Sequence, residues 1–244
     1  MKLNRLFLGV VFALLLLLTN CQDDRRIIKD YYFPVEDLKV PKVYEFESIG
    51  NEHDPPFYWL FQTVERGEST FLTGTFYSYD FVKYQAVEEE VVKNGMLLNR
   101  FRWFEKDTAT QKPVEVPVQI EAGNVFGFEL SDPPAVWVSS VHWRLPQDTL
   151  TKMTFIRNRQ YEKDTTYTFE GKTYDCLKIY VRELIDNERD GHLEQEYEAT
   201  ELYAKGLGLV YFRKNIAKEW QMIYRLKHIY AVPEFEQKFN VRLQ

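Results

Sequence analysis

The sequence predicts an all-β fold, an antiparallel meander that closes as a barrel or curves as a half-barrel. Apolar and polar residues alternate along many segments, which is typical of strands with one packed and one wet face. Turn residues separate these segments, and long amphipathic helical patterns are scarce. About a dozen strands with hairpin-like connections favour a meander. Short helices are expected near the termini, after Pro34 and around Glu234–Phe239.

The clearest strand is expected over Glu219–Tyr230, where large side chains alternate with polar ones. In a half-barrel, its apolar face would line a groove for an apolar ligand; in a closed barrel, it would be part of a filled core. The side chains expected on this face are Trp220, Met222, Tyr224 and Leu226, followed by His228 and Tyr230. A histidine on such a face is expected to be a core residue with a hydrogen-bond partner.

The first residues have the pattern of a secretory signal. Lys2 and Arg5 form a basic start, and the apolar run Leu6–Leu18 is shorter than the ~20 residues of a membrane-spanning helix. The run ends in Leu18-Thr19-Asn20-Cys21, which resembles the lipobox of bacterial lipoproteins, with Asn in place of the commoner small residue before Cys. The resemblance implies cleavage before Cys21 and attachment of diacylglycerol and a palmitate-type chain to this cysteine, and thereby a membrane partner.

This resemblance also suggests a location and a domain plan. Gln22-Asp23-Asp24 is similar to the short acidic export tag of Bacteroidota-type lipoproteins, which implies an outer-membrane lipoprotein; whether it faces outward or the periplasm is left open. The expected plan is a signal peptide over 1–20, a lipid anchor and tether over 21–41, and one β domain over 42–244. No Gly/Ser/Pro-rich linker interrupts that domain.

Charge and cysteine content exclude two classes of protein. Removing residues 1–20 takes away Lys2 and Arg5, which changes the formal net charge from −6 to −8. Nucleic-acid binding needs clustered cations, and the only short run is Arg25-Arg26, which we expect near the lipid head groups. With Cys21 lipidated, Cys176 is left as a free, structural thiol, so that no disulfide framework forms.

The segment Tyr203–Val210 carries a further resemblance. Its Ala-Lys-Gly-Leu-Gly-Leu-Val turn, after the Gly171–Tyr174 stretch, is similar to the late strands of LolA-like or LppX-like half-barrel lipoprotein domains. The resemblance implies a curved sheet that in some relatives holds acyl chains. From the residues alone, Gly206 and Gly208 are expected to allow positive φ and close backbone approach at the turn.

No catalytic residues, metal or cofactor are predicted. The sequence has none of the common hydrolase, zinc-protease or phosphate-loop motifs. The strand face of His192, Glu194, Glu196 and Glu198 could offer ligands to a cation, although a solvated surface is expected. Glu201 could belong to a glycosidase pair, for which a second carboxylate would have to face it.

Two features concern glycans. Aromatic residues make up 16% of the chain, and Trp137 and Trp143, which we expect to be exposed, are candidates for stacking on a sugar. Asp-Thr followed by a small or apolar residue is similar to the O-glycan acceptor of Bacteroidota-type envelope proteins. This resemblance implies glycosylation at Thr108, Thr149 and Thr165, which are expected in loops, where Asp-Thr is also ordinary turn chemistry.

The sequence therefore favours a lipid-anchored envelope protein with a non-catalytic role. It would bind an apolar or glycan ligand or support an outer-membrane assembly, with protein partners unknown. The alternative is an envelope hydrolase that acts on glycans.

Overall fold

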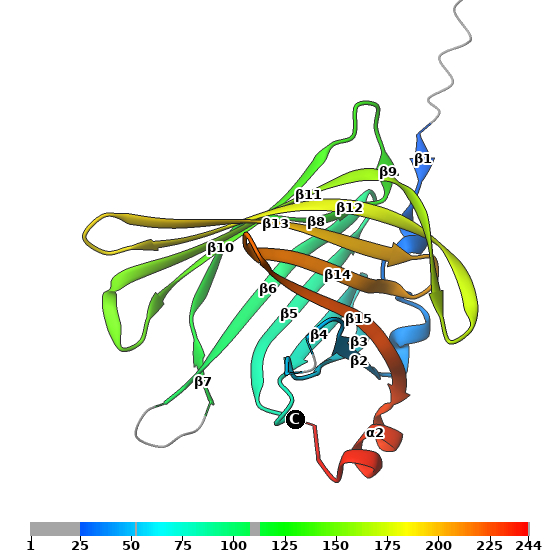
Figure 1. Ribbon diagram of the computed structural model, residues 1–244, viewed down its shortest axis with the longest axis horizontal. Helices are drawn as coiled ribbons and strands as arrows, with labels where there is room; N and C mark the ends of the chain where they lie inside the picture. Colours follow the sequence, from blue (N-terminus) through cyan, green and yellow to red (C-terminus); the bar gives the residue numbers. More distant parts are fainter. Residues whose placement is uncertain (1–24, 52, 108–112, 244) are drawn as a thin grey trace, which may run out of the picture.

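The computed structural model describes residues 25–51, 53–107 and 113–243. Over these residues the chain is almost all strand, with two 3-10 turns near its start and one α-helix at its end (Figure 1). The strands are β1 Arg26–Ile27, β2 Lys42–Ser48, β3 Phe57–Arg66, β4 Ser69–Tyr77, β5 Lys83–Val92, β6 Gly95–Lys106, β7 Pro113–Val116, β8 Val118–Gly127, β9 Glu129–Leu130, β10 Val136–Leu145, β11 Asp148–Phe169, β12 Lys172–Glu188, β13 His192–Ala204, β14 Gly208–Ala217 and β15 Trp220–Ala231. The helical segments are η1 Lys29–Tyr31, η2 Asp37–Lys39 and α2 Val232–Phe239.

The main sheet closes on itself. Its thirteen described strands run in the order β5-β4-β3-β2-β15-β14-β13-β12-β11-β10-β8-β6-β7, and every pairing is antiparallel. An additional pairing between β5 and β6, with Gln85 opposite Trp103 and Val87 opposite Phe101, joins the two sides and leaves β7 outside the ring. The predicted all-β antiparallel barrel is confirmed. The alternative, a half-barrel with free edges, is wrong, because β5 and β6 satisfy each other's edge hydrogen bonds.

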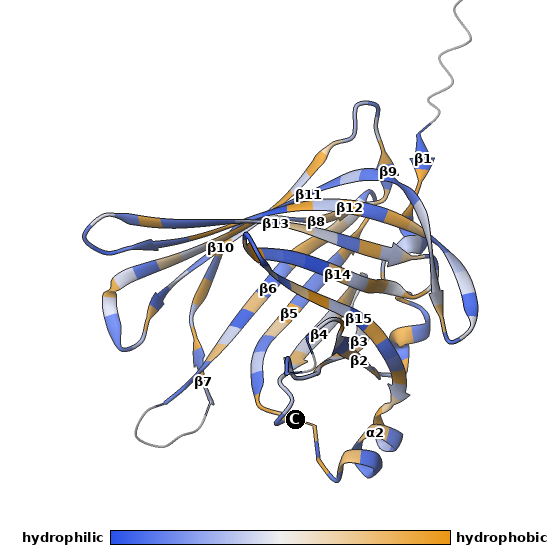
Figure 2. Cartoon of the chain, viewed as in Figure 1, coloured by the Kyte–Doolittle hydropathy of each residue, from blue (hydrophilic) through white to orange (hydrophobic). Residues whose placement is uncertain are grey.

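Alternation places large rings inside the barrel, and Figure 2 shows the hydrophilic and hydrophobic bands along the strands. On β3, Phe57, Trp59 and Phe61 point inward, whereas Tyr58 points outward. The outward side is also covered locally: Phe235 of α2 is fully buried against Tyr58 and Tyr230. The barrel therefore has an aromatic interior and a small second core beneath α2.

The N-terminal segment fills one end of the barrel. Ile28, Tyr32, Phe33 and Leu38 are buried in the main core, and β1 pairs with β9. Figure 1 shows this segment at the opposite end from the projecting β10–β11 and β12–β13 hairpins. The tether expected over 21–41 must be corrected from residue 25 onward, because these apolar side chains pack into the folded domain.

Two further expectations concern this end of the barrel. Arg25 and Arg26, expected near lipid head groups, form ion pairs with Glu129 and Asp164 of the domain. Cys176 is a free thiol that is 1% exposed, and burial raises its pKa to about 11. None of the described helices is long and apolar enough to cross a membrane.

Candidate functional site

A cavity of about 840 Å³ occupies the barrel interior above the N-terminal segment. Aromatic side chains from β2–β5, among them Phe46, Phe57, Trp59 and Phe76, form one wall. The lining also includes Trp103 and Trp143, whose rings stack with centroids 5.6 Å apart. Ligand sites in proteins are commonly apolar cavities of about 300–1,000 Å³ with a few polar groups. The volume and the lining of this cavity suit an apolar molecule.

The facing wall, formed by β11–β14, carries charged side chains. Arg157 and Lys214 both contact Glu183, with Nε and Nη2 of Arg157 at 2.7 and 2.5 Å from Oε1 and Nζ of Lys214 at 2.6 Å from Oε2. Burial alone would raise the pKa of Glu183, but the two cations together lower it to about 2. This carboxylate is therefore held in its ionised form.

A second polar group lies deeper, against the N-terminal segment. Arg159 donates to both oxygens of Glu201, at 2.8 and 3.4 Å, and Tyr203 donates to Oε2 of Glu201 at 3.0 Å. Burial opposes ionisation of Glu201, yet Arg159 lowers the pKa of this carboxyl. Tyr32 donates to Glu89 at 2.7 Å, and burial raises the pKa of Glu89. A lowered pKa makes Glu201 unsuited to the role of a glycosidase acid.

The predicted groove residues of β15 lie in three different environments. Met222 and Tyr224 line the cavity. Leu226 is 2% exposed and belongs to the filled core, whereas Trp220, at the start of the strand, is 53% exposed. The predicted face is thus inside the barrel at its centre, but only two of its four side chains reach the cavity.

The expected position of His228 is wrong. A β-bulge between Leu226 and His228 shifts the register against β2 and reverses the alternation, so that Ile229 packs on the main core. His228 is instead partly exposed and lies 2.8 Å from Oε1 of Glu170. Tyr230 accordingly packs in the outer core under α2, where its hydroxyl donates to Glu45.

The two tryptophans proposed for sugar stacking also face inward. Trp137 is 3% exposed and packs on Phe126, and Trp143 lines the cavity. The expectation that both are exposed is wrong, because β10 directs this side of the strand into the barrel. The turn glycines have positive φ, +78° at Gly206 and +87° at Gly208.

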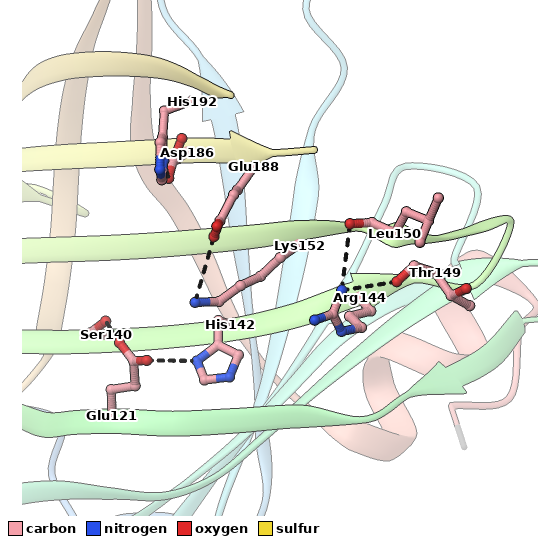
Figure 3. Close-up of polar contacts among 10 residues, drawn as sticks. All are labelled: Glu121, Ser140, His142, Arg144, Thr149, Leu150, Lys152, Asp186, Glu188 and His192. Atoms are coloured by element: carbon pink, nitrogen blue, oxygen red, sulfur yellow. Dashed lines mark hydrogen bonds and ion pairs between the residues drawn. The ribbon is translucent and has the colours of Figure 1, made fainter. Parts of the chain in front are cut away.

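The outer face of the β12–β13 hairpin brings together three groups that could hold a cation. Asp186, His192 and Glu194 each offer a ligand atom, and these atoms lie within 4.8 Å of one another. Figure 3 shows His192 beside Asp186, with Nδ1 at 2.8 Å from Oδ2. Further along the same face, Glu196 pairs with Arg182 and Glu198 accepts from Tyr180. His192 and Glu194 are exposed, and these contacts are those of a solvated strand surface.

The predicted acceptor threonines occupy different settings. Thr149 is exposed beside the β10–β11 turn, where its carbonyl accepts from Arg144 (Figure 3). Thr165 was expected in a loop, but it lies within the long strand β11, opposite Cys176. The expected loop position is wrong because strand β11 continues through Asp164 and Thr165. Thr108 and Cys21 lie outside the described residues.

Comparisons with known proteins find similar folds but no similar sequences. No family model and no curated protein matches the chain. A provisionally named lipoprotein from Parabacteroides distasonis ATCC 8503 has a similar structure, with a TM-score of 0.56 and 11% identity over 82% of this chain and 98% of that one. An exported protein with a YmcC-like fold from Bacteroides fragilis NCTC 9343 has a TM-score of 0.53 and 10% identity over the same shares. At these identities the likeness concerns the fold alone.

Proposed function

We propose that the protein is a lipid-anchored envelope lipoprotein that binds an apolar ligand inside its barrel without transforming it. The observation that carries the proposal is the cavity of about 840 Å³ with its aromatic wall. Side chains fill the rest of the interior, as the burial of Leu226 and Leu177 illustrates. A cavity of this size lowers the stability of a fold, because its lining gives up packing contacts. Its presence therefore favours a role in holding a ligand.

The anchoring part of the proposal rests on the lipobox-like end of the leader at Cys21. The similar structures from Parabacteroides and Bacteroides, one named a lipoprotein and the other exported, support the same class of location. Because the folded domain begins within a few residues of Cys21, we infer that the barrel lies close to the surface of the membrane, which we propose to be the outer one.

One observation favours the alternative, hydrolysis of a glycan. Glu89 of β5 and Glu201 of β13 line the same cavity, and their pKa values are moved in opposite directions, as in an acid–base pair. We place this function second because Arg159 holds both oxygens of Glu201, and a catalytic carboxylate needs an oxygen directed at its substrate. Release of sugar from glycan substrates by the wild type, lost in Glu89→Gln, would reverse this order.

Binding can be tested on residues 22–244, which include every described element of the closed barrel. The domain is purified without detergent, analysed by native mass spectrometry for co-purified ligand, and titrated with the neutral dye N-phenyl-1-naphthylamine. We expect dye fluorescence to saturate at one site. Val87→Trp, which fills the cavity, should abolish it, whereas Thr73→Trp on the outward side of neighbouring β4 should not. Equal dye binding by both variants would contradict the proposal.

A further inference from the structure

The charged side chains that line the cavity are not paired one to one. They are Glu89, Arg157, Arg159, Glu183, Glu201 and Lys214. Ion pairs taken out of water often give no more stability than apolar side chains of equal volume, so a charged layer inside an aromatic barrel calls for another role. Perturbed charged groups that line a cavity are candidates for ligand contacts.

The three cations and the three carboxylates balance formally, but positive charge is locally in excess at one place. Arg159 and Glu201 form a balanced pair, and Glu89 receives its hydrogen bond from the neutral Tyr32. Glu183, in contrast, is shared by two cations, Arg157 and Lys214. This group of three side chains carries a formal charge of +1 and lies in a site of low polarity, where an anion is attracted more strongly than in water.

The cations, and not the carboxylate, reach the open space. The side chains of Arg157 and Lys214 are 31% and 20% exposed, against 5% for Glu183. A guanidinium has five N–H donors and an ammonium has three. The contacts with Glu183 use Nε and Nη2 of Arg157 and one direction of Nζ of Lys214. The remaining donors suit a planar or tetrahedral oxyanion.

We propose that Arg157 and Lys214 bind the anionic head group, a carboxylate or a phosphate, of an amphiphile whose apolar part lies against the aromatic wall. The inference rests on the proposed binding function and names its ligand class. Phe57, Trp59 and Phe76 of the opposite wall would contact the apolar chain. Such a cavity selects ligands that have a charged and an apolar end.

Three ligands of equal chain length separate the two parts of the proposal. Residues 22–244 are titrated with palmitate, hexadecyl phosphate and hexadecanol by displacement of N-phenyl-1-naphthylamine. We expect at least one of the anionic ligands to bind about tenfold or more tightly than the alcohol, as charge-assisted hydrogen bonds imply. A preference between palmitate and hexadecyl phosphate identifies the head group.

Arg157→Gln and Lys214→Gln should each lower the affinity for the anionic ligands much more than the affinity for hexadecanol, and so remove this preference. Each variant keeps one cation on Glu183, so both are expected to fold, which a thermal melt checks. The matched control is Arg182→Gln, which removes an ion pair with Glu196 from the outer face of the same wall. If wild type and variants bind anions and alcohol equally, the head-group inference is overturned and the binding function stands. If neither dye nor any ligand binds, the proposed function itself fails.

Discussion

The ring of Phe33 lies directly against Gly208: a Cβ atom added to Gly208 would come within 2.5 Å of Cδ1 of Phe33. Phe33 belongs to the N-terminal segment, and Gly208 begins β14 at the far end of the sequence. The contact therefore ties the segment that fills one end of the barrel to the barrel wall. It also explains why a residue without a side chain is needed at this position.

We expect Gly208→Ala to destabilise the fold through two effects. Its φ of +87° is unfavourable for alanine by about 1–2 kcal/mol, and displacement of the Phe33 ring adds about 1–3 kcal/mol. Gly206→Ala is the control, because its φ is +78° but nothing lies within 4 Å of an added Cβ. Urea unfolding should show the larger loss for Gly208→Ala. Equal losses would mean that Phe33 does not pack here.

Met222 and Leu226 provide a second comparison within one strand. Leu226 is buried in the filled core, so Leu226→Ala should cost about 2–5 kcal/mol of unfolding free energy. Met222 lines the cavity, and its truncation should cost less while changing the affinity for N-phenyl-1-naphthylamine. Unfolding and dye titration of both variants check this. A full core cost at Met222 with unchanged dye binding would contradict its place on the cavity wall.

Strand alternation predicts much of this fold. The inward side chains of β3 follow the two-residue period, and those of β15 follow it from Met222 to Leu226. What it does not reveal are the bulges. The single extra residue after Leu226 moves His228 to the other face, and no local signal in the sequence marks the change. Closure of the barrel is not marked in the sequence either, since it depends on which residues of β5 and β6 pair once the whole sheet has formed.

The charged side chains that line the cavity are harder to predict from the sequence than the apolar ones. Glu201 stands out in the sequence as a carboxylate between two tyrosines, but its partner Arg159 lies two strands away along the sheet. Likewise, Arg157 and Lys214 meet at Glu183 only because β11, β12, β13 and β14 are neighbours in this order. The sequence does contain a weak signal for these inward charges. On β11 and β12, charged residues fall on the same side of the strand as the apolar Phe155 and Ile185.

Glu183 should make stability depend on pH. Its pKa falls from the ordinary 4.5 to about 2 in the folded protein, because Arg157 and Lys214 outweigh burial. A lowered folded-state pKa contributes stability that is complete above pH 4.5 and is lost as the pH falls towards 2, on the order of 3 kcal/mol in all. Glu183→Gln should therefore lose stability at pH 6 and approach the wild type near pH 2.

Urea unfolding of both proteins at pH 6 and pH 2.5 measures this difference. Glu196→Gln is the control, because its carboxylate pairs with Arg182 on the exposed outer face, where an ion pair is worth only about 0–1 kcal/mol. A gap between Glu183→Gln and the wild type that stays constant with pH would show that the two cations do not hold Glu183 ionised.

The anchor can be tested with the two cysteines of the chain. Cys21→Ala in the full-length protein should abolish lipid attachment, so that the protein leaves the detergent phase of a Triton X-114 partition or accumulates uncut. One acyl chain binds a membrane reversibly, but three chains, at about 0.8 kcal/mol per buried methylene, hold a protein permanently. Cys176→Ala is the control, since this thiol is buried in the folded domain and its loss should leave partitioning unchanged. If Cys21→Ala fractionates and migrates as the wild type does, the proposed lipid anchor is wrong.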